Sequence, residues 1–220
     1  MTVLREFRVC EFTTLSRDGT PTTWPTAARY EPENGRFLIT TSIGFPQKVY
    51  NIRRNPRVSL LFSDPTASKL VSPAAVLVQG DASVSDSIVT SMAGLEDYWR
   101  ENIFSRQPAS EVISSNPMMR RMMDWYYMRL VIFVQTCRIS WWPAGDFHQP
   151  ARVLEVNLWD KLLKNLAAFP SAVLTGLDAD GYPFSVRVKP QPDSTRQVLH
   201  VQLPPEMPIR PGGAAVPLSR

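Results

Sequence analysis

The sequence predicts a mainly β protein of the α+β class, with short strands bounded by turns and helices at the periphery. Of its 220 residues, 44% are hydrophobic and 20% are charged, so the chain has enough apolar residues for a packed core. Proline occurs 20 times, nearly twice its usual share of about 5%, and proline shortens helices. Asp-Gly pairs at 18–19 and 180–181 each separate two short runs that are typical of paired strands.

Three further strands and one short helix are predicted in the first half of the chain. Strands are expected at 36–42 and 57–62, where β-branched and apolar residues predominate. The segment 46–55 between them is expected to form a short helix. Another strand is predicted at 74–84, and Gly80 within it marks a bulge or a close approach of another backbone.

Two helices are predicted after the strand at 74–84. The helical spacing of its apolar residues predicts a helix over 86–106. A second helix is expected over 116–127, because Asn116 suits an N-cap and a proline follows it. A long strand with two apolar faces is predicted at 128–142, and a helix over 155–168 leads into the C-terminal part.

An internal repeat relates two parts of the chain at an offset of 162 residues. The segments TTLSRDGTP, at 13–21, and TGLDADGYP, at 175–183, share the pattern T-x-L-x-x-D-G-x-P. The correspondence continues without a gap to Pro46 and Pro208 and ends after Pro211. Such self-similarity indicates a duplicated structural unit, and two unrelated hairpins are the alternative.

The repeat divides the chain into two units. Residues 1–150 are predicted to form the first domain. Residues 151–220 are predicted to form a linker helix and a truncated second copy, because nothing like RRNPRVSLLF of the first copy follows in the second.

Charge and composition exclude several classes of protein. The net charge is +4, but the basic residues are scattered, so a nucleic-acid partner is not expected and a small phosphorylated ligand fits equally well. The longest stretch without a charged side chain, 165–177, is shorter than the roughly 20 apolar residues that cross a membrane. Two isolated cysteines, Cys10 and Cys137, provide neither a disulfide framework nor a metal site. A cytoplasmic location is expected.

The chain offers few side chains for catalysis. Only His148 and His200 are available as bases, and each is expected to be an ordinary loop or strand residue. No zinc, dinucleotide or P-loop motif occurs, so no metal site is expected. If the protein is an enzyme, a cofactor carries the reaction.

A phosphate cradle is predicted around the turn that follows residue 41. Thr40 and Thr41 supply hydroxyl groups at a strand end, and Lys48 lies at the start of the next helix, whose amides also bind anions. Arg29, on the preceding strand, adds a planar set of donors. The alternative is a strand-turn-helix with a solvated lysine.

Residues 10–152 resemble the flavin-binding split barrels related to pyridoxamine 5'-phosphate oxidase. The resemblance begins with D-G-x-P and continues with N-x-x-x-N-P-R-V-S-L-L, at 51–61. It then includes V-x-V-x-G-x-A, at 76–82, and R-[IV]-x-x-W, at 138–142, with a second arginine ten residues further on. The four motifs occur in the family's order.

The resemblance implies a Greek-key split β-barrel with peripheral helices, followed here by a partial second copy. It also implies a homodimer that holds FMN in the cleft between its subunits. The residues that correspond to the family's phosphate ligands are Arg29, Thr40, Thr41 and Lys48. Trp142 and Arg152 correspond to a late tryptophan and arginine near the flavin.

The resemblance implies an FMN-dependent oxidoreductase with a small-molecule redox substrate. The oxidase closes its substrate site with R-x-H, and the corresponding residues here are His148, Gln149 and Pro150, so pyridoxamine phosphate is not the expected substrate. Two alternatives are a reductase of the same fold that uses a deazaflavin coenzyme and a non-catalytic module that binds flavin or haem.

Overall fold

One seven-stranded antiparallel sheet forms the main body of the protein. The computed structural model describes residues 2–66, 68–105, 107–122, 127–144, 157–169, 171–205, 207 and 214–215. The strand order in the sheet is β2-β1-β5-β6-β7-β4-β3. The strands are β1 (Cys10–Leu15), β2 (Pro21–Thr26), β3 (Ala28–Glu31), β4 (Arg36–Ser42), β5 (Arg57–Phe62), β6 (Ala75–Val89) and β7 (Arg129–Trp142). The predicted fold class, a mainly β split barrel with peripheral helices, is confirmed.

A hydrophobic cluster fills the interior of the curved sheet. Strand residues that alternate along the chain point into it, as the two-residue period of a strand requires. Two helices add to it: α1 (Thr2–Glu6) supplies Leu4, and α2 (Gln47–Arg54) supplies Val49 and Ile52. The strand residues of the cluster include Phe12, Phe37, Ile39, Val58, Leu60, Phe62, Val78, Ile132 and Val134. The two helices are therefore fixed against the barrel by burial.

Most of the elements predicted from the sequence are present. The strands expected at 36–42 and 57–62 are β4 and β5, and α2 lies between them as expected. The strand expected at 128–142 is β7. Asn116 accepts hydrogen bonds from the amides of Met118 and Met119 at the start of α5 (Pro117–Met122), as an N-cap does. The part of that predicted helix over 123–126 lies outside the described residues.

The helix predicted over 86–106 is wrong in its first part. Strand β6 continues to Val89, and Ile88 pairs with Leu130 of β7 instead of lying on a helix face. The helical insertion starts only at α3 (Glu96–Tyr98), continues as a π-helix, η1 (Trp99–Phe104), and is followed by α4 (Pro108–Ser115). No helix in the described ranges is both long enough and apolar enough to cross a membrane.

Gly80 lies at a bulge where β6 crosses β7 closely, as the sequence predicted. The register between the two strands shifts between Gln79 and Gly80. A Cβ atom at this position would overlap the carbonyl oxygen of Gln135 and lie 3.3 Å from Cα of Thr136. Because both neighbours are backbone atoms, neither can move aside without distorting the sheet.

We expect Gly80→Ala to lower the free energy of unfolding by about 1–3 kcal/mol, the usual cost of overpacking. Urea denaturation measures this change. Gly44→Ala is the matched control, because its Cβ would make only an ordinary contact, 3.7 Å from the Ser42 hydroxyl. Equal losses in both variants would contradict the steric explanation.

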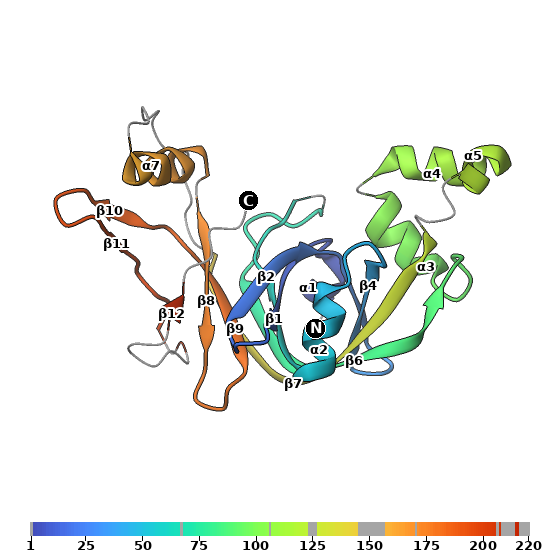
Figure 1. Ribbon diagram of the computed structural model, residues 1–220, viewed down its shortest axis with the longest axis horizontal. Coiled ribbons are helices and arrows are strands. Elements are labelled where there is room, and N and C mark those ends of the chain that lie inside the picture. The colour runs from blue at the N-terminus through green and yellow to red at the C-terminus, as the bar shows by residue number, and fades with distance from the viewer. Residues whose placement is uncertain are drawn as a thin grey trace.

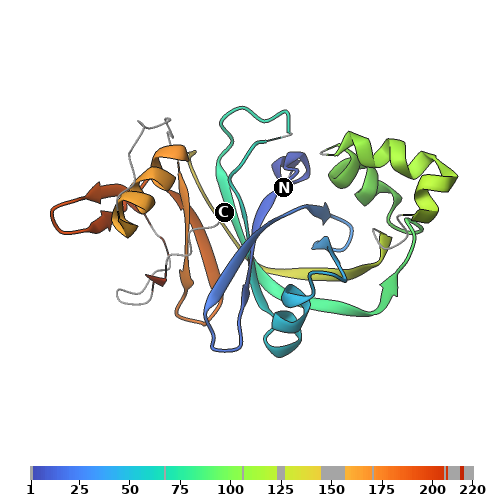
Figure 2. The same cartoon turned by 45° about the horizontal axis from the view of Figure 1, so that its top comes forward.

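The C-terminal unit lies at one end of the molecule and the insertion α3–α5 at the other (Figures 1 and 2). It contains α7 (Leu158–Ala168), the hairpin β8 (Ala172–Leu177) and β9 (Pro183–Val188), the hairpin β10 (Gln191–Asp193) and β11 (Val198–His200), and β12 (Ala214–Ala215). Asn157 caps α7 in a capping box with Asp160.

The two copies of the repeat agree in strand bounds and in register. At the offset of 162, the bounds of β1 and β2 become those of β8 and β9. Cys10 pairs with Thr26 in the first hairpin, and their counterparts Ala172 and Val188 pair in the second. The hairpins β3–β4 and β10–β11 also share one register. Arg29 pairs with Leu38 in the first, and their counterparts Gln191 and His200 pair in the second.

The Asp-Gly loops differ in one respect from the two-residue turn that the sequence predicts. The Gly19 amide donates to the Ser16 carbonyl, and the Ser16 amide donates to the Thr20 carbonyl, so the loop has three residues. Gly19 alone has a positive φ, 82°, as in a type I turn followed by a left-handed residue. The loop around Gly181, with a φ of 78°, repeats the same two bonds.

Candidate functional site

The predicted phosphate cradle begins where β4 ends and the chain turns into α2. Successive residues of a strand point to opposite faces, so Thr40 and Thr41 cannot face the same ligand from a regular strand. Thr41 is 4% exposed, and its hydroxyl donates to the Phe45 carbonyl over 3.2 Å. This bond closes the turn that places Lys48 in the first turn of α2.

Lys48 is a half-buried cation. Its ammonium nitrogen lies 5.1 Å from the centre of the Trp24 ring, within the range of a cation–π contact. Burial lowers the pKa of the Lys48 ammonium from its ordinary value. None of the ion pairs among the described residues involves Lys48, and no side chain caps the first turn of α2. A partly desolvated cation beside uncapped helix amides favours an anionic ligand.

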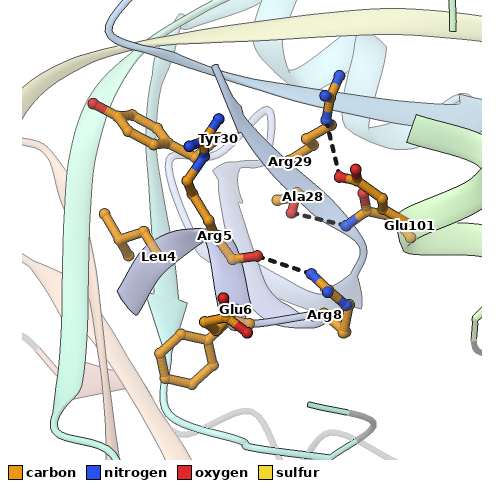
Figure 3. A pocket seen from close by; sticks show the side chains of 10 residues that line it. Leu4, Arg5, Glu6, Arg8, Ala28, Arg29, Tyr30 and Glu101 are labelled. Carbon is orange, nitrogen blue, oxygen red and sulfur yellow. Dashed lines mark hydrogen bonds and ion pairs between the residues drawn. The ribbon is translucent and has the colours of Figure 1, made fainter. Parts of the chain in front are cut away.

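Arg29, in contrast, is already paired with two carboxylates of the helical insertion. Its Nη2 lies 3.2 Å from Oδ2 of Asp97 in α3, and its Nε lies 3.3 Å from Oε2 of Glu101 in η1. Figure 3 shows Arg29 and Glu101 side by side between β3 and the insertion. The positive charge predicted at Arg29 is therefore compensated within the chain.

Thr40 is covered by the same insertion. Its amide donates to the hydroxyl oxygen of Tyr98 over 3.2 Å, and the Tyr98 hydroxyl donates to the Ala27 carbonyl over 3.1 Å. Arg129, at the start of β7, donates to the Thr40 hydroxyl over 3.4 Å. Burial raises the pKa of the Tyr98 hydroxyl, so it stays protonated and keeps donating to Ala27.

Four of the predicted site residues thus fall into two separate places. Thr41 and Lys48 lie at the turn into α2, and Arg29 and Thr40 lie beneath α3 and η1. No hydrogen bond or ion pair among the described residues joins the first pair to the second. Their role towards a cofactor stays a prediction.

A cavity of about 280 Å³ opens next to Arg29 (Figure 3). Its lining includes Glu101 and two arginines of the N-terminal segment, Arg5 and Arg8. Arg8 donates to the Arg5 carbonyl over 2.8 Å. The cavity is smaller than the roughly 300–1,000 Å³ of most ligand pockets, and its lining includes neither hydroxyl of the predicted cradle nor Lys48.

Trp142 lies in a different region of the molecule. It is 8% exposed and packs in a hydrophobic cluster with Leu61, Leu77 and Phe184, between the barrel and the C-terminal hairpin. The indole therefore serves the packing of these two parts. Arg152, the last of the predicted cofactor residues, lies outside the described residues, as does His148.

The sequence profile of the pyridoxamine 5'-phosphate oxidase family matches residues 1–129, which is more than half of the chain. The chain belongs to this family. The match covers the barrel through the start of β7 and includes α2 with Lys48. None of the curated proteins compared with the chain matches it.

Several solved structures are similar to this protein at low sequence identity. An F420 reductase is 18% identical, with 63% of this chain and 94% of that chain covered and a TM-score of 0.40. A FAD-binding protein from Mesorhizobium loti is 17% identical, with coverage of 63% and 85% and a TM-score of 0.39. General stress protein 26 from Bacillus anthracis is 15% identical, with coverage of 64% and 88% and a TM-score of 0.41.

Several side chains that surround the predicted site in this member of the pyridoxamine 5'-phosphate oxidase family could not be predicted from the sequence. Asp97, Tyr98 and Glu101 belong to an insertion whose placement over β3 and β4 no local pattern indicates. Arg129 meets Thr40 only because β7 pairs with β4. The position of Trp24 was partly predictable, because it lies opposite Phe12 in the hairpin that the first Asp-Gly pair predicts.

Proposed function

We propose that this protein is an FMN-dependent oxidoreductase that acts on a small-molecule redox substrate. The observation that carries the proposal is Lys48, a half-buried ammonium with no carboxylate partner among the described residues, at the turn where the family resemblance expects a phosphate. Membership of the pyridoxamine 5'-phosphate oxidase family, and a FAD-binding protein among the related structures, support a flavin as the ligand.

The residues at this turn fit the phosphate of FMN. Lys48 would supply the charge, and the uncapped first-turn amides of α2 would supply donors, while the Thr41 hydroxyl holds the turn by donating to the Phe45 carbonyl. A bound flavin supplies hydride or electron transfer, which no side chain of this chain can perform. The chain's own contribution is to hold the phosphate and exclude water from it. No acid or base is assigned.

FMN fits the local charge better than a deazaflavin coenzyme with a long acidic tail. Such a tail requires several uncompensated cations along the groove. Arg29 is neutralised by Asp97 and Glu101, which leaves Lys48 as the uncompensated cation among those predicted ligands that the structure describes. One phosphate group, held by this cation together with the helix amides, fits the site better than several acidic groups.

Titration of the purified protein with FMN tests the proposal. We expect FMN fluorescence to be quenched on binding, while a deazaflavin coenzyme binds more weakly. A nicotinamide donor should then bleach the bound flavin. Absence of binding for both coenzymes would contradict the proposal, and binding without bleaching by any donor would favour the flavin-binding module over an enzyme.

Release of Arg29 from its two carboxylates should strengthen FMN binding. We expect the double variant Asp97→Asn, Glu101→Gln to bind FMN about 3- to 10-fold more tightly, because each exposed ion pair is worth only about 0.2–1 kcal/mol and the guanidinium becomes available to the phosphate. Isothermal titration calorimetry measures this difference.

The control for that prediction is Glu33→Gln, an exposed carboxylate on the turn between β3 and β4 with no ion pair among the described residues. It changes the net charge without touching Arg29. A similar gain in the control would mean that overall charge, and not Arg29, sets the affinity. No gain in the double variant would remove Arg29 from the cradle and leave Lys48 in it.

A further inference from the structure

Four hydroxyl groups form a closed ring of hydrogen bonds between the barrel and the C-terminal hairpin. The Thr13 hydroxyl lies 2.8 Å from that of Thr23 and 2.8 Å from that of Ser185. The Thr175 hydroxyl lies 3.0 Å from that of Thr23 and 3.1 Å from that of Ser185. Thr13, Thr175 and Ser185 have no exposed surface, and Thr23 is partly exposed, so three of the four hydroxyls are shielded from water.

The ring has two-fold symmetry with respect to the repeat. The offset of 162 converts Thr13 into Thr175 and Thr23 into Ser185. When the two copies are exchanged, the Thr13–Ser185 contact becomes the Thr175–Thr23 contact. Each position therefore meets its partner in both directions, which is the defining property of an isologous interface between identical subunits. The hairpins β1–β2 and β8–β9 meet as two subunits of a dimer do.

The rest of this interface is extensively bonded. Arg187 of β9 forms an ion pair with Glu11 of β1. Asp178, at the end of β8, accepts hydrogen bonds from Gln79 over 3.0 Å and from Arg138 over 3.0 Å. Leu61, Leu77 and Trp142 pack against Val173 and Phe184 in one buried cluster. The C-terminal hairpin is thus held to the barrel by charge, hydrogen bonds and burial together.

The surroundings of the two hairpins are not symmetric. β9 is buried along most of its length, whereas its counterpart β2 is half-exposed. The loop at 178–182 is clamped by Gln79, Asp81 and Arg138, whereas among the described residues the hydrogen bonds of the loop at 16–20 stay within that loop. The clamping strands β6 and β7 have no counterpart among the described residues of the C-terminal unit.

The second copy also lacks most of the predicted phosphate ligands. The positions that correspond to Arg29, Thr40 and Thr41 are Gln191, Gln202 and Leu203, and none of them is a cation or a hydroxyl. Lys48 corresponds to Arg210, which lies outside the described residues. The second copy therefore retains the contact surface of the barrel and only one cation of its cradle.

We infer that the C-terminal hairpin takes the place of a partner subunit, so that this protein is a monomer whose dimer interface is closed within one chain. The self-complementary face around Thr13 and Thr23 is already occupied and cannot receive a second copy. This departs from the homodimer that the family resemblance implies. It also sets the stoichiometry at one ligand site per particle.

The mass in solution tests the inference on the intact chain. Sedimentation or light scattering should give 24.8 kDa, the mass of one chain, at micromolar concentrations. A particle of about twice that mass would overturn the inference, whether or not it binds flavin. This readout is independent of the proposed function, because it requires no ligand.

Engineered disulfides across the hydroxyl ring identify which chain supplies the hairpin. In a background with Cys137→Ser, the pair Thr13→Cys and Ser185→Cys, and the symmetric pair Thr23→Cys and Thr175→Cys, should each oxidise within one chain. A non-reducing gel should show a single-chain band for both. Covalent dimers from either pair would mean that the hairpin is exchanged between chains and would overturn the inference.

A mixture of two single variants, Thr13→Cys and Ser185→Cys, is the control for collision between molecules. It should give no covalent product, since no Thr13 meets Ser185 of another chain. If neither double variant oxidises although both fold, the interface itself is contradicted. If a double variant fails to fold, the mass of the wild-type chain still decides.

Discussion

Lys48→Glu is expected to leave the protein without bound flavin. The substitution places a carboxylate where the phosphate would lie, in a half-buried position where repulsion is poorly screened. The milder Lys48→Ala should weaken FMN binding by about 1–3 kcal/mol, the range for a hydrogen bond to a charged group that is left unmade. The ratio of flavin absorbance to protein absorbance after gel filtration measures retention, and calorimetry measures affinity.

Two further variants separate a specific phosphate contact from general charge. Lys189→Glu, at an exposed position of the C-terminal unit, makes the same charge change and should leave FMN binding unchanged. Lys48→Arg should retain FMN, and its affinity should persist to higher pH than that of the wild type, because the lysine has a lowered pKa and loses its proton first. Equal retention of FMN by the wild type and Lys48→Glu would exclude this lysine from the site.

The hairpins and their repeat were the most predictable parts of the fold. An Asp-Gly pair between two strand-forming runs favours a hairpin through local interactions alone. The same pattern recurs 162 residues later, and the strands of the second hairpin have the corresponding bounds. The helix predicted over 86–106 failed for a tertiary reason. Ile88 has a helical spacing to Met92, yet it pairs with Leu130 because β7 supplies a long strand edge that extends β6. A local residue pattern cannot indicate pairing with a strand about 40 residues further along the chain.

The residue types of the candidate site could be predicted from the sequence, but whether their charges are paired could not. Thr41 and Lys48 lie within one short turn, so sequence spacing was sufficient to place them together. Arg29 is different, because Asp97 and Glu101 lie far from it in sequence and neutralise it only in the folded chain. The sequence showed a cation there, whereas the structure contains an ion pair.

The largest effect on stability is expected for Arg187→Ala. The side chains of Arg187 and Glu11 are 19% and 12% exposed, so their ion pair is largely removed from water. Arg187 also donates to the hydroxyls of Ser63, over 2.9 Å, and Ser171, over 3.1 Å. Loss of the guanidinium leaves Glu11 buried and uncompensated, which should lower the free energy of unfolding by about 3–5 kcal/mol. Urea denaturation of the intact chain measures the loss.

A double variant distinguishes the destabilisation caused by an unpaired buried charge from the destabilisation caused by loss of contacts across the interface. Arg187→Met with Glu11→Leu removes both charges and keeps apolar volume, and such replacements are often neutral or stabilising. We therefore expect the double variant to recover most of the stability that Arg187→Ala loses, and to remain a monomer. If it stays as unstable as the single variant, the hydrogen bonds to Ser63 and Ser171 would hold the hairpin in place.

The ion pair between Arg187 and Glu11 has no symmetric counterpart. The position that corresponds to Glu11 in the second copy is Val173, and the position that corresponds to Arg187 in the first copy is Pro25. The charge thus marks which copy acts as the barrel and which as its internal partner.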